Sequence, residues 1–219
     1  FHNRVNPAVA ALQETVAKGD LGRIIHGNLR LSNTTFVPRE MLSWAESSSA
    51  LWFLGSHAVD ALRFVTGDEV VAVQAVRRAG FLKGLGIDTA DVHLAILQLR
   101  SGGVVTLENS WVLPPDSPMV FDFKLELVGE KGSVQVSTAD NGAFRKFTGQ
   151  GLRAADLFGG VPAAPGRIGG FVYEAIARFV DAVVSGGPLL ATAADGLAAT
   201  RILAAIEQAA ASGDTVSLV

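Results

Sequence analysis

Residues 91–112, DVHLAILQLRSGGVVTLENSWV, decide the fold of this chain. They contain two strand candidates, 91–99 and 104–112, separated by the turn sequence Ser101-Gly102-Gly103. Strands joined by so short a turn must pair antiparallel, because a parallel pair needs a crossover of about a dozen residues or more. The stretch therefore predicts an antiparallel hairpin.

Further strand candidates lie on both sides of this hairpin, and turn signals such as Pro114-Pro115-Asp116 separate them. In residues 23–32, apolar Ile25, Leu29 and Leu31 alternate with polar residues, which is typical of a strand with one wet or functional face. The other candidates are 69–76, 120–128, 133–136, 143–147 and, at the C-terminus, 215–219. Together they predict a large, predominantly antiparallel sheet.

Four segments have helical patterns: 7–18, 57–65, 170–184 and 192–211. The polar stretch 33–49 and the stretch 149–169, rich in Gly, Pro and Ala, read as loops. Helices at both ends of a large antiparallel sheet favour an α+β fold with the helices packed on one face. We therefore expect one domain over 1–219, whose other sheet face is free to meet something else.

Composition excludes several classes of function. A net charge of −3 gives no basic footprint for nucleic acid, and the absence of cysteine excludes disulfides and thiolate metal sites. The apolar content is 49%, yet no run approaches the roughly 20 apolar residues that a membrane span needs. A small-molecule or protein partner and a cytoplasmic location are the expectations, with no membrane and no nucleic acid.

The segment Leu54-Gly55-Ser56-His57-Ala58-Val59-Asp60 carries the chemistry that we expect. A neutral His57 could accept a proton on one ring nitrogen while the other is oriented, as a general acid or base near pH 7 does. Asp60 lies on the same helical face and could orient the ring or receive a substrate hydroxyl. The alternative is structural: Ser56 caps the helix, His57 lies in its first turn, and Asp60 interacts with the helix dipole.

Two further patterns have plainer interpretations. Asp88, Asp91 and His93 could suggest a metal site. Asp91 and His93 share one strand face, but no third ligand at a recognisable spacing accompanies them, so we expect no metal. Residues 149–154 match the dinucleotide fingerprint G-x-G-x-x-G/A, but Gly159-Gly160 and Pro162 interrupt the helix that should follow.

The three tryptophans could line a sugar-sized pocket, although core packing is the commoner role of any single one. They are Trp44, Trp52 and Trp111. Trp111, at a strand end, is the one that we expect to contact substrate.

Several motifs occur together in one order. They are Phe1-x-x-Arg4-x-x-Pro7, the turn 18–24 (KGDLGRI), Leu54-Gly55-Ser56-His57-x-x-Asp60 with Phe64-x-x-Gly67, Asp88-Thr89-Ala90, Ser110-Trp111, 129–133 (GEKGS) and 195–201 (DGLAATR). In this order the chain resembles, over nearly its whole length, the C-terminal domain of the glucose-fructose oxidoreductase / inositol dehydrogenase (Gfo/Idh/MocA) family. No single motif is specific, but the combination is.

The resemblance implies an NAD(P)-dependent dehydrogenase or reductase acting on a sugar, cyclitol or related polyol. His57 would be catalytic, while Asp60, Asn3, Arg4 and Trp111 would contribute to the substrate pocket. NAD or NADP would bind mainly to a nucleotide-binding domain that we expect upstream, because the chain begins at Phe1 without Met. This chain alone should bind no cofactor and should be inactive, and a homodimer or homotetramer would form through the sheet face.

Two departures from the family leave an alternative open. The family's acid/base lysine, in a Glu-Lys-Pro motif, has no counterpart in this chain. Many members also have a glycine run and an aspartate four residues before the histidine, where this chain has Ser47-Ser48-Ser49 and Phe53. The chain is therefore either a variant that relies on His57 and the absent lysine, or a non-catalytic ligand-sensing or scaffold relative.

Overall fold

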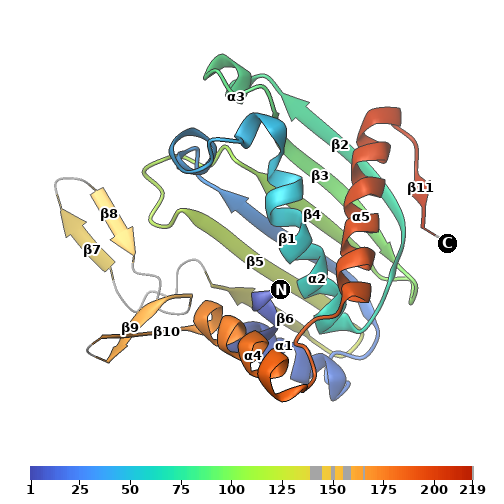
Figure 1. Cartoon of the computed structure of the whole chain (residues 1–219). Coiled ribbons are helices and arrows are strands. Elements are labelled where there is room, and N and C mark those ends of the chain that lie inside the picture. Colours follow the sequence, from blue (N-terminus) through green and yellow to red (C-terminus); the bar gives the residue numbers. More distant parts are fainter. Residues whose placement is uncertain (139–144, 149–150, 155–158, 165, 219) are drawn as a thin grey trace.

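A seven-stranded sheet dominates the computed structural model, which describes residues 1–138, 145–148, 151–154, 159–164 and 166–218 (Figure 1). The strand order is β11-β2-β3-β4-β1-β5-β6. The strands are β1 (Ile24–Asn33), β2 (Val70–Ala79), β3 (Ala90–Leu99), β4 (Val104–Ser110), β5 (Phe121–Gly129), β6 (Ser133–Ser137) and β11 (Val216–Ser217). With its helices the sheet forms the α+β architecture that the sequence predicts.

The antiparallel hairpin predicted from residues 91–112 is present in the structure. Strands β3 and β4 pair antiparallel, with Val92 opposite Ser110 and Gln98 opposite Val104. Strands β5 and β6 pair antiparallel as well, with Leu125 opposite Val136. In both pairs the short turn between the strands leaves no other arrangement.

One strand pairing differs from the expectation that consecutive strands with short connections pair with each other. Strands β4 and β5 are not neighbours although only residues 111–120 separate them, because β1 lies between the two. Strand β1 pairs parallel with β4, with Gly27 opposite Val105, and antiparallel with β5, with Gly27 opposite Leu127. A residue with a side chain would not fit at Gly27, since a Cβ there would lie 2.6 Å from the carbonyl oxygen of Glu126.

The helices α2 (Ser56–Thr66) and α5 (Ala193–Ser212) lie across one face of the sheet (Figure 1). Strand β3 shows why: His93, Ala95, Leu97 and Leu99 point into the core, while the alternating residues remain exposed. Helix α5 begins with a capping box. The side chains of Thr192 and Asp195 each accept a hydrogen bond from the other residue's backbone N–H group. The opposite face of the sheet is left open.

The other two main helices are α1 (Pro7–Ala17) and α4 (Phe171–Ser185), and the N-terminal turn η1 (His2–Val5) packs between them and α2. The Asn6 side chain accepts a hydrogen bond from the backbone N–H of Ala8 and so caps α1, with Pro7 at the first helical position. This cap fixes the first residues of the chain beside the start of α2.

Several short elements were not predicted. They are η2 (Val37–Met41), η3 (Ala45–Ser47), η4 (Leu51–Gly55), α3 (Phe81–Gly84), β8 (Gly151–Ala154), β9 (Val161–Ala164) and β10 (Arg167–Gly169), whereas β7 (Arg145–Thr148) overlaps the strand expected at 143–147. The prediction that 149–169 is one long loop is thus wrong: β9 pairs with β10, and β8 pairs with β7. Closely spaced Gly and Pro residues in this segment obscure strands of three or four residues.

Candidate active site

A cavity of about 240 Å³ opens where η1, β1, β5 and the start of α2 meet. Its polar lining residues are His2, Asn3, Asn33, His57 and Thr138. The apolar ones are Leu31, Phe53, Leu54, Phe121, Phe123, Phe171 and Val172, with Gly159 completing the wall. Of the residues predicted to form the site, the structure brings His57 and Asn3 to this cavity.

His57 is the best candidate for acid/base chemistry in the cavity. It follows the π-helical turn η4, which places it in the first turn of α2. Its Nδ1 is buried and has no hydrogen-bond partner among the described residues. Burial, together with the positive N-terminus, lowers the pKa of His57 to about 4, so the ring is neutral at pH 7.

His2 packs against His57, with 4.6 Å between the ring centroids. Burial is the main cause that lowers the pKa of His2 to about 4, and the neighbouring His57 adds to it. His2 was not singled out in the sequence, because its importance comes from the contact between η1 and α2 and from no motif. Two neutral imidazoles therefore line one wall of the cavity.

Asn33, at the end of β1, is a second polar group that sequence reasoning missed. It is 5% exposed, and its Oδ1 is buried without a hydrogen-bond partner among the described residues. Unsatisfied buried polar atoms are uncommon in folded proteins and call for a water molecule or a ligand. Asn33 and His57, each with one such atom, line the same cavity, which is the pattern expected of a polar ligand site.

Arg4 and Asp60 form a buried ion pair. The Nε of Arg4 lies 3.0 Å from Oδ2 of Asp60, and its Nη2 lies 2.6 Å from Oδ1. Arg4 Nη2 also lies 3.0 Å from Asp195 Oδ1. The backbone N–H of Thr192 and the guanidinium of Arg4 hold the pKa of Asp195 below its usual range. Neither Arg4 nor Asp60 lines the cavity, so their contact with a substrate stays a prediction.

Trp111 is completely buried and does not line the cavity. The ring of Phe53 lies between it and the cavity region, with centroids 5.9 Å from Trp111 and 5.8 Å from Trp44. Contact between Trp111 and a substrate stays a prediction, and in this structure Trp111 packs against Phe53.

The acidic residues near His93 have structural partners. Asp91 accepts hydrogen bonds from the backbone N–H groups of Phe81 and Leu82, at 2.9 and 2.8 Å. Asp88 pairs with Lys83, and His93 Nε2 lies 3.4 Å from Glu207. Among the residues that the structure describes, no group of three or more His, Cys, Asp or Glu could hold a metal ion. The fingerprint at 149–154 lies partly outside the described residues.

The model of the GFO/IDH/MocA C-terminal domain matches residues 9–135. The chain belongs to the Gfo/Idh/MocA family. Inositol 2-dehydrogenase 1 of Mycolicibacterium vanbaalenii is 35% identical over 230 residues, which cover 100% of this chain and 61% of that protein. Inositol 2-dehydrogenase of Mycolicibacterium gilvum is 34% identical over 153 residues, or 68% of this chain and 40% of the relative.

Solved structures of the Gfo/Idh/MocA fold superpose over the whole chain. GenD2 from gentamicin A biosynthesis, in complex with NAD, has a TM-score of 0.81 at 22% identity. The match covers 100% of this chain and 63% of the GenD2 chain. The scyllo-inositol dehydrogenase of Lactobacillus casei, with bound NAD(H) and scyllo-inositol, has a TM-score of 0.76 at 20% identity, covering 99% of this chain and 63% of that one. These likenesses show the fold, and the chain spans about three fifths of the relatives' length.

Phe53 is the clearest departure within the family site. Its ring lines the cavity, at the position where the resemblance found in the sequence leads us to expect an aspartate. An apolar ring can neither accept a hydroxyl proton nor bond an imidazole. A catalytic His57 would therefore have no carboxylate at this position.

None of the helices in the described part of the chain is long and apolar enough to cross a membrane.

Proposed function

We propose that this chain is the substrate-binding domain of an NAD(P)-dependent oxidoreductase, which transfers hydride to or from a sugar, cyclitol or related polyol. The observation that carries the proposal is the neutral, buried His57, which lines a cavity of about 240 Å³ and whose Nδ1 has no hydrogen-bond partner among the described residues. Relatives named as inositol dehydrogenases support the substrate class.

The nicotinamide would supply or accept the hydride, and the residues of this chain fit a role beside it. His57 can accept a proton from a substrate hydroxyl, because a neutral imidazole nitrogen is an acceptor. Asn33 Oδ1 can accept a hydrogen bond from a second hydroxyl. The surrounding phenylalanines would exclude water from the reacting carbon. Of the predicted pocket residues, Asn3 lines this cavity and would contact the ring of a substrate or a nicotinamide.

The dinucleotide itself would be held mainly by a domain encoded upstream, for which the 61% of the Mycolicibacterium vanbaalenii relative that this chain covers leaves room. Solved neighbours with bound NAD support that cofactor. The protein would be cytoplasmic.

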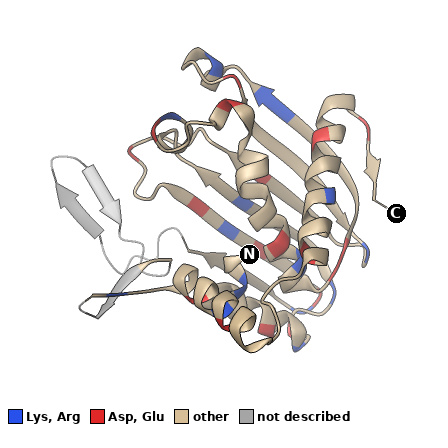
Figure 2. Ribbon diagram, viewed as in Figure 1, with Lys and Arg blue, Asp and Glu red and all other residues tan. Residues whose placement is uncertain are grey.

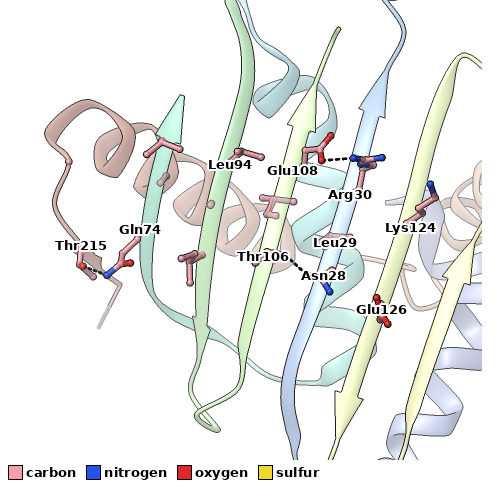
Figure 3. Close-up of a pocket in the computed structure, with 16 residues that line it drawn as sticks. Asn28, Leu29, Arg30, Gln74, Leu94, Thr106, Glu108, Lys124, Glu126 and Thr215 are labelled. Carbon is pink, nitrogen blue, oxygen red and sulfur yellow. Dashed lines mark hydrogen bonds and ion pairs between the residues drawn. The ribbon is translucent and has the colours of Figure 1, made fainter. Parts of the chain in front are cut away.

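The open face of the sheet would join two or four copies. It is hollowed by a groove of about 750 Å³ that is apolar over β2 and β3 and charged over β1, β4 and β5 (Figure 3). Val76, Leu94 and Ile96 are exposed on the apolar side. On the charged side, Arg30 bridges Glu108 at 2.8 Å and Asp122 at 3.1 Å. Exposed aliphatic residues flanked by charges are typical of an interface between subunits.

The test is turnover of a polyol panel, including myo-inositol and scyllo-inositol, by the full-length gene product with NAD(H) or NADP(H). We expect oxidation of at least one polyol. Failure to bind either cofactor would overturn the proposal.

A second candidate is a ligand-sensing relative without catalysis, and Phe53 in the place of the family's aspartate favours it. This candidate predicts that the full-length protein binds a polyol and a dinucleotide but does not turn over. Calorimetric binding together with the turnover assay separates the two candidates.

A further inference from the structure

A second pocket, of about 370 Å³, shares no lining residue with the cavity of His57. The two are separated within the turn η4, because Trp52 lines the second pocket while Phe53, the next residue, lines the cavity. Pockets of about 300–1,000 Å³ are typical of small-molecule sites. The second pocket is therefore large enough for a ligand of its own, and we call it the Trp52 pocket.

Three features of the sequence to which the proposed function gives no role meet in the Trp52 pocket. They are a tryptophan, the serine run in place of the family's glycines, and two members of the apparent metal pattern. The residues concerned are Trp52, Ser47-Ser48-Ser49, Asp88 and His93. Arg77 near the end of β2 and Glu207 on α5 also line the pocket. The fold thus gathers polar residues from four separate segments.

The serine run is fixed to the neighbouring wall of the pocket. Thr89, the residue before β3, donates a hydrogen bond from Oγ1 to the carbonyl oxygen of Ser48. This bond joins segments that are 41 positions apart in the chain. The pocket is therefore formed before any ligand binds.

His93 is a buried polar side chain in this pocket whose hydrogen bonds are not satisfied. It is 2% exposed, and neither of its ring nitrogens has a hydrogen-bond partner among the described residues. Burial is the main cause that lowers the pKa of His93, so the ring is neutral at pH 7 and has one donor and one acceptor. A buried polar group without partners calls for a water molecule or a ligand.

Glu207 and Arg77 make only long contacts beside His93. Oε1 of Glu207 lies 3.4 Å from Nε2 of His93, and Nη1 of Arg77 donates to Oε2 of Glu207 at 3.4 Å. Both distances exceed the usual length of a hydrogen bond. Because a carboxylate can accept several hydrogen bonds, Glu207 can still accept shorter ones from a ligand.

The charges of the pocket restrict the ligand. Three carboxylates line it, from Glu46, Asp88 and Glu207, against one guanidinium, from Arg77. Figure 2 shows acidic and basic residues together at this end of the sheet, where β2 finishes beside α3 and the last turns of α5. An excess of negative charge repels anions. A metal ion is no better candidate, since no group of three or more suitable ligands exists among the described residues.

An uncharged ring with several hydroxyls fits the remaining groups. Each hydroxyl both donates and accepts, so it can pair with the carboxylates, the guanidinium and the serine hydroxyls. Trp52 is 40% exposed and offers an aromatic surface for the C–H face of such a ring.

We propose that the Trp52 pocket is a binding site for an uncharged sugar or cyclitol, distinct from the cavity of His57. The indole of Trp52 packs on the ring of the ligand, and Glu207 and the serine run bind its hydroxyls. The proposal goes beyond the proposed function and does not depend on it, because binding in this pocket needs neither a cofactor nor turnover.

NMR of the full-length gene product with ¹⁵N-labelled tryptophan tests the proposal. The indole N–H signal of Trp52 is the one that is missing from the Trp52→Phe variant. Glucose, galactose, myo-inositol and scyllo-inositol are titrated separately into the tens of millimolar range. We expect the Trp52 signal to shift and to saturate with at least one of them. No shift, or only a shift that rises linearly without saturation, would refute the site.

A charge-removing substitution sharpens the test. Glu207→Gln keeps the shape of the side chain but should raise the Kd about fivefold or more, because hydrogen bonds to a charged acceptor are stronger than those to a neutral one. The matched control is Glu130→Gln, which breaks an exposed ion pair with Arg23 outside the pocket and should leave the Kd unchanged. An equal Kd for Glu207→Gln and the parent would overturn the proposal.

His57→Ala separates the two pockets. This variant should give the same titration of the Trp52 signal as the parent, since His57 does not line the Trp52 pocket. Loss of the response in His57→Ala would place the ligand in the other cavity and overturn the proposal. A saturable shift with inorganic phosphate and with none of the four polyols would overturn it as well. Absence of turnover, with a saturable Trp52 response, would contradict the proposed function alone.

Discussion

Arg4 donates two hydrogen bonds to Asp60, from Nε to Oδ2 at 3.0 Å and from Nη2 to Oδ1 at 2.6 Å. The Asp60 side chain is completely buried. This contact joins η1 to the middle of α2, so it fixes the residues on either side of the cavity relative to each other. Asn3 precedes Arg4, and His57 lies one helical turn before Asp60. The ion pair thus positions the site although neither member lines it.

We predict that Asp60→Asn lowers the free energy of unfolding by about 2–4 kcal/mol, because removing one charge of a buried pair leaves the other poorly compensated. Asp195 remains beside Arg4, which limits the loss. Urea unfolding of the 219-residue chain measures the effect. The matched control is Glu14→Gln, which breaks the exposed pair with Lys18 and should have no measurable effect. An Asp60→Asn variant as stable as the parent would contradict the structural role.

Replacing His57 tests the catalytic role. In the full-length protein, His57→Ala should lower kcat/KM by about two orders of magnitude or more, as loss of a general acid/base does. His26, on β1, is exposed and does not line the cavity, so His26→Ala should retain full activity. Steady-state kinetics with the best polyol of the panel decides the matter, and an unchanged rate for His57→Ala would remove this residue from the mechanism.

The lowered pKa of His57 makes stability depend on pH. The pKa is about 4 in the folded chain, against an ordinary histidine pKa of 6.5. Between these two values the unfolded state binds more protons, so the free energy of unfolding rises with pH up to about 6.5 and is then constant for this group. The stability lost on acidification is on the order of 2–3 kcal/mol.

His57→Phe should make that dependence weaker, because this ring can no longer take up a proton, while His2, whose pKa is also lowered to about 4, keeps its own contribution. Unfolding curves of the parent and the variant at intervals from pH 4.5 to 7.5 provide the comparison. If both proteins show the same slope with pH, the folded-state pKa of His57 is not depressed.

Phe53 links the site to the core, and Phe53→Asp tests both roles. The new carboxylate would raise the pKa of His57 by favouring the imidazolium, and NMR titration of the ring would detect the shift. Stability should fall by about 3 kcal/mol, because the ring contacts with Trp44 and Trp111 are lost and a charge is buried. Phe53→Leu is the control and should leave the His57 titration unchanged. An unshifted His57 in Phe53→Asp would show that the two side chains do not interact.

Local sequence patterns predicted the helices and the hairpin that depend on neighbouring residues alone. Alternation and short turns predicted the β3–β4 hairpin, and helical periodicity predicted α2 and α5. The insertion of β1 between β4 and β5 depends on long-range pairing, which no local pattern encodes. The same limit applies to the site. His57 could be identified from a motif, whereas His2 and Asn33 became visible once η1 and the end of β1 were folded against α2.

The open face of the sheet should control the oligomeric state. Leu94 and Ile96 project from β3 on that face and are 45% and 40% exposed, where a second copy would cover them. We predict that Leu94→Lys combined with Ile96→Lys converts the full-length assembly into a monomer, because four or more like charges would meet across a symmetric interface. Light scattering coupled to size-exclusion chromatography measures the mass. The control is Glu14→Gln on helix α1, away from the open face of the sheet, which should not change the mass. A monomeric parent, or an unchanged mass in the double variant, would exclude this face as the subunit interface.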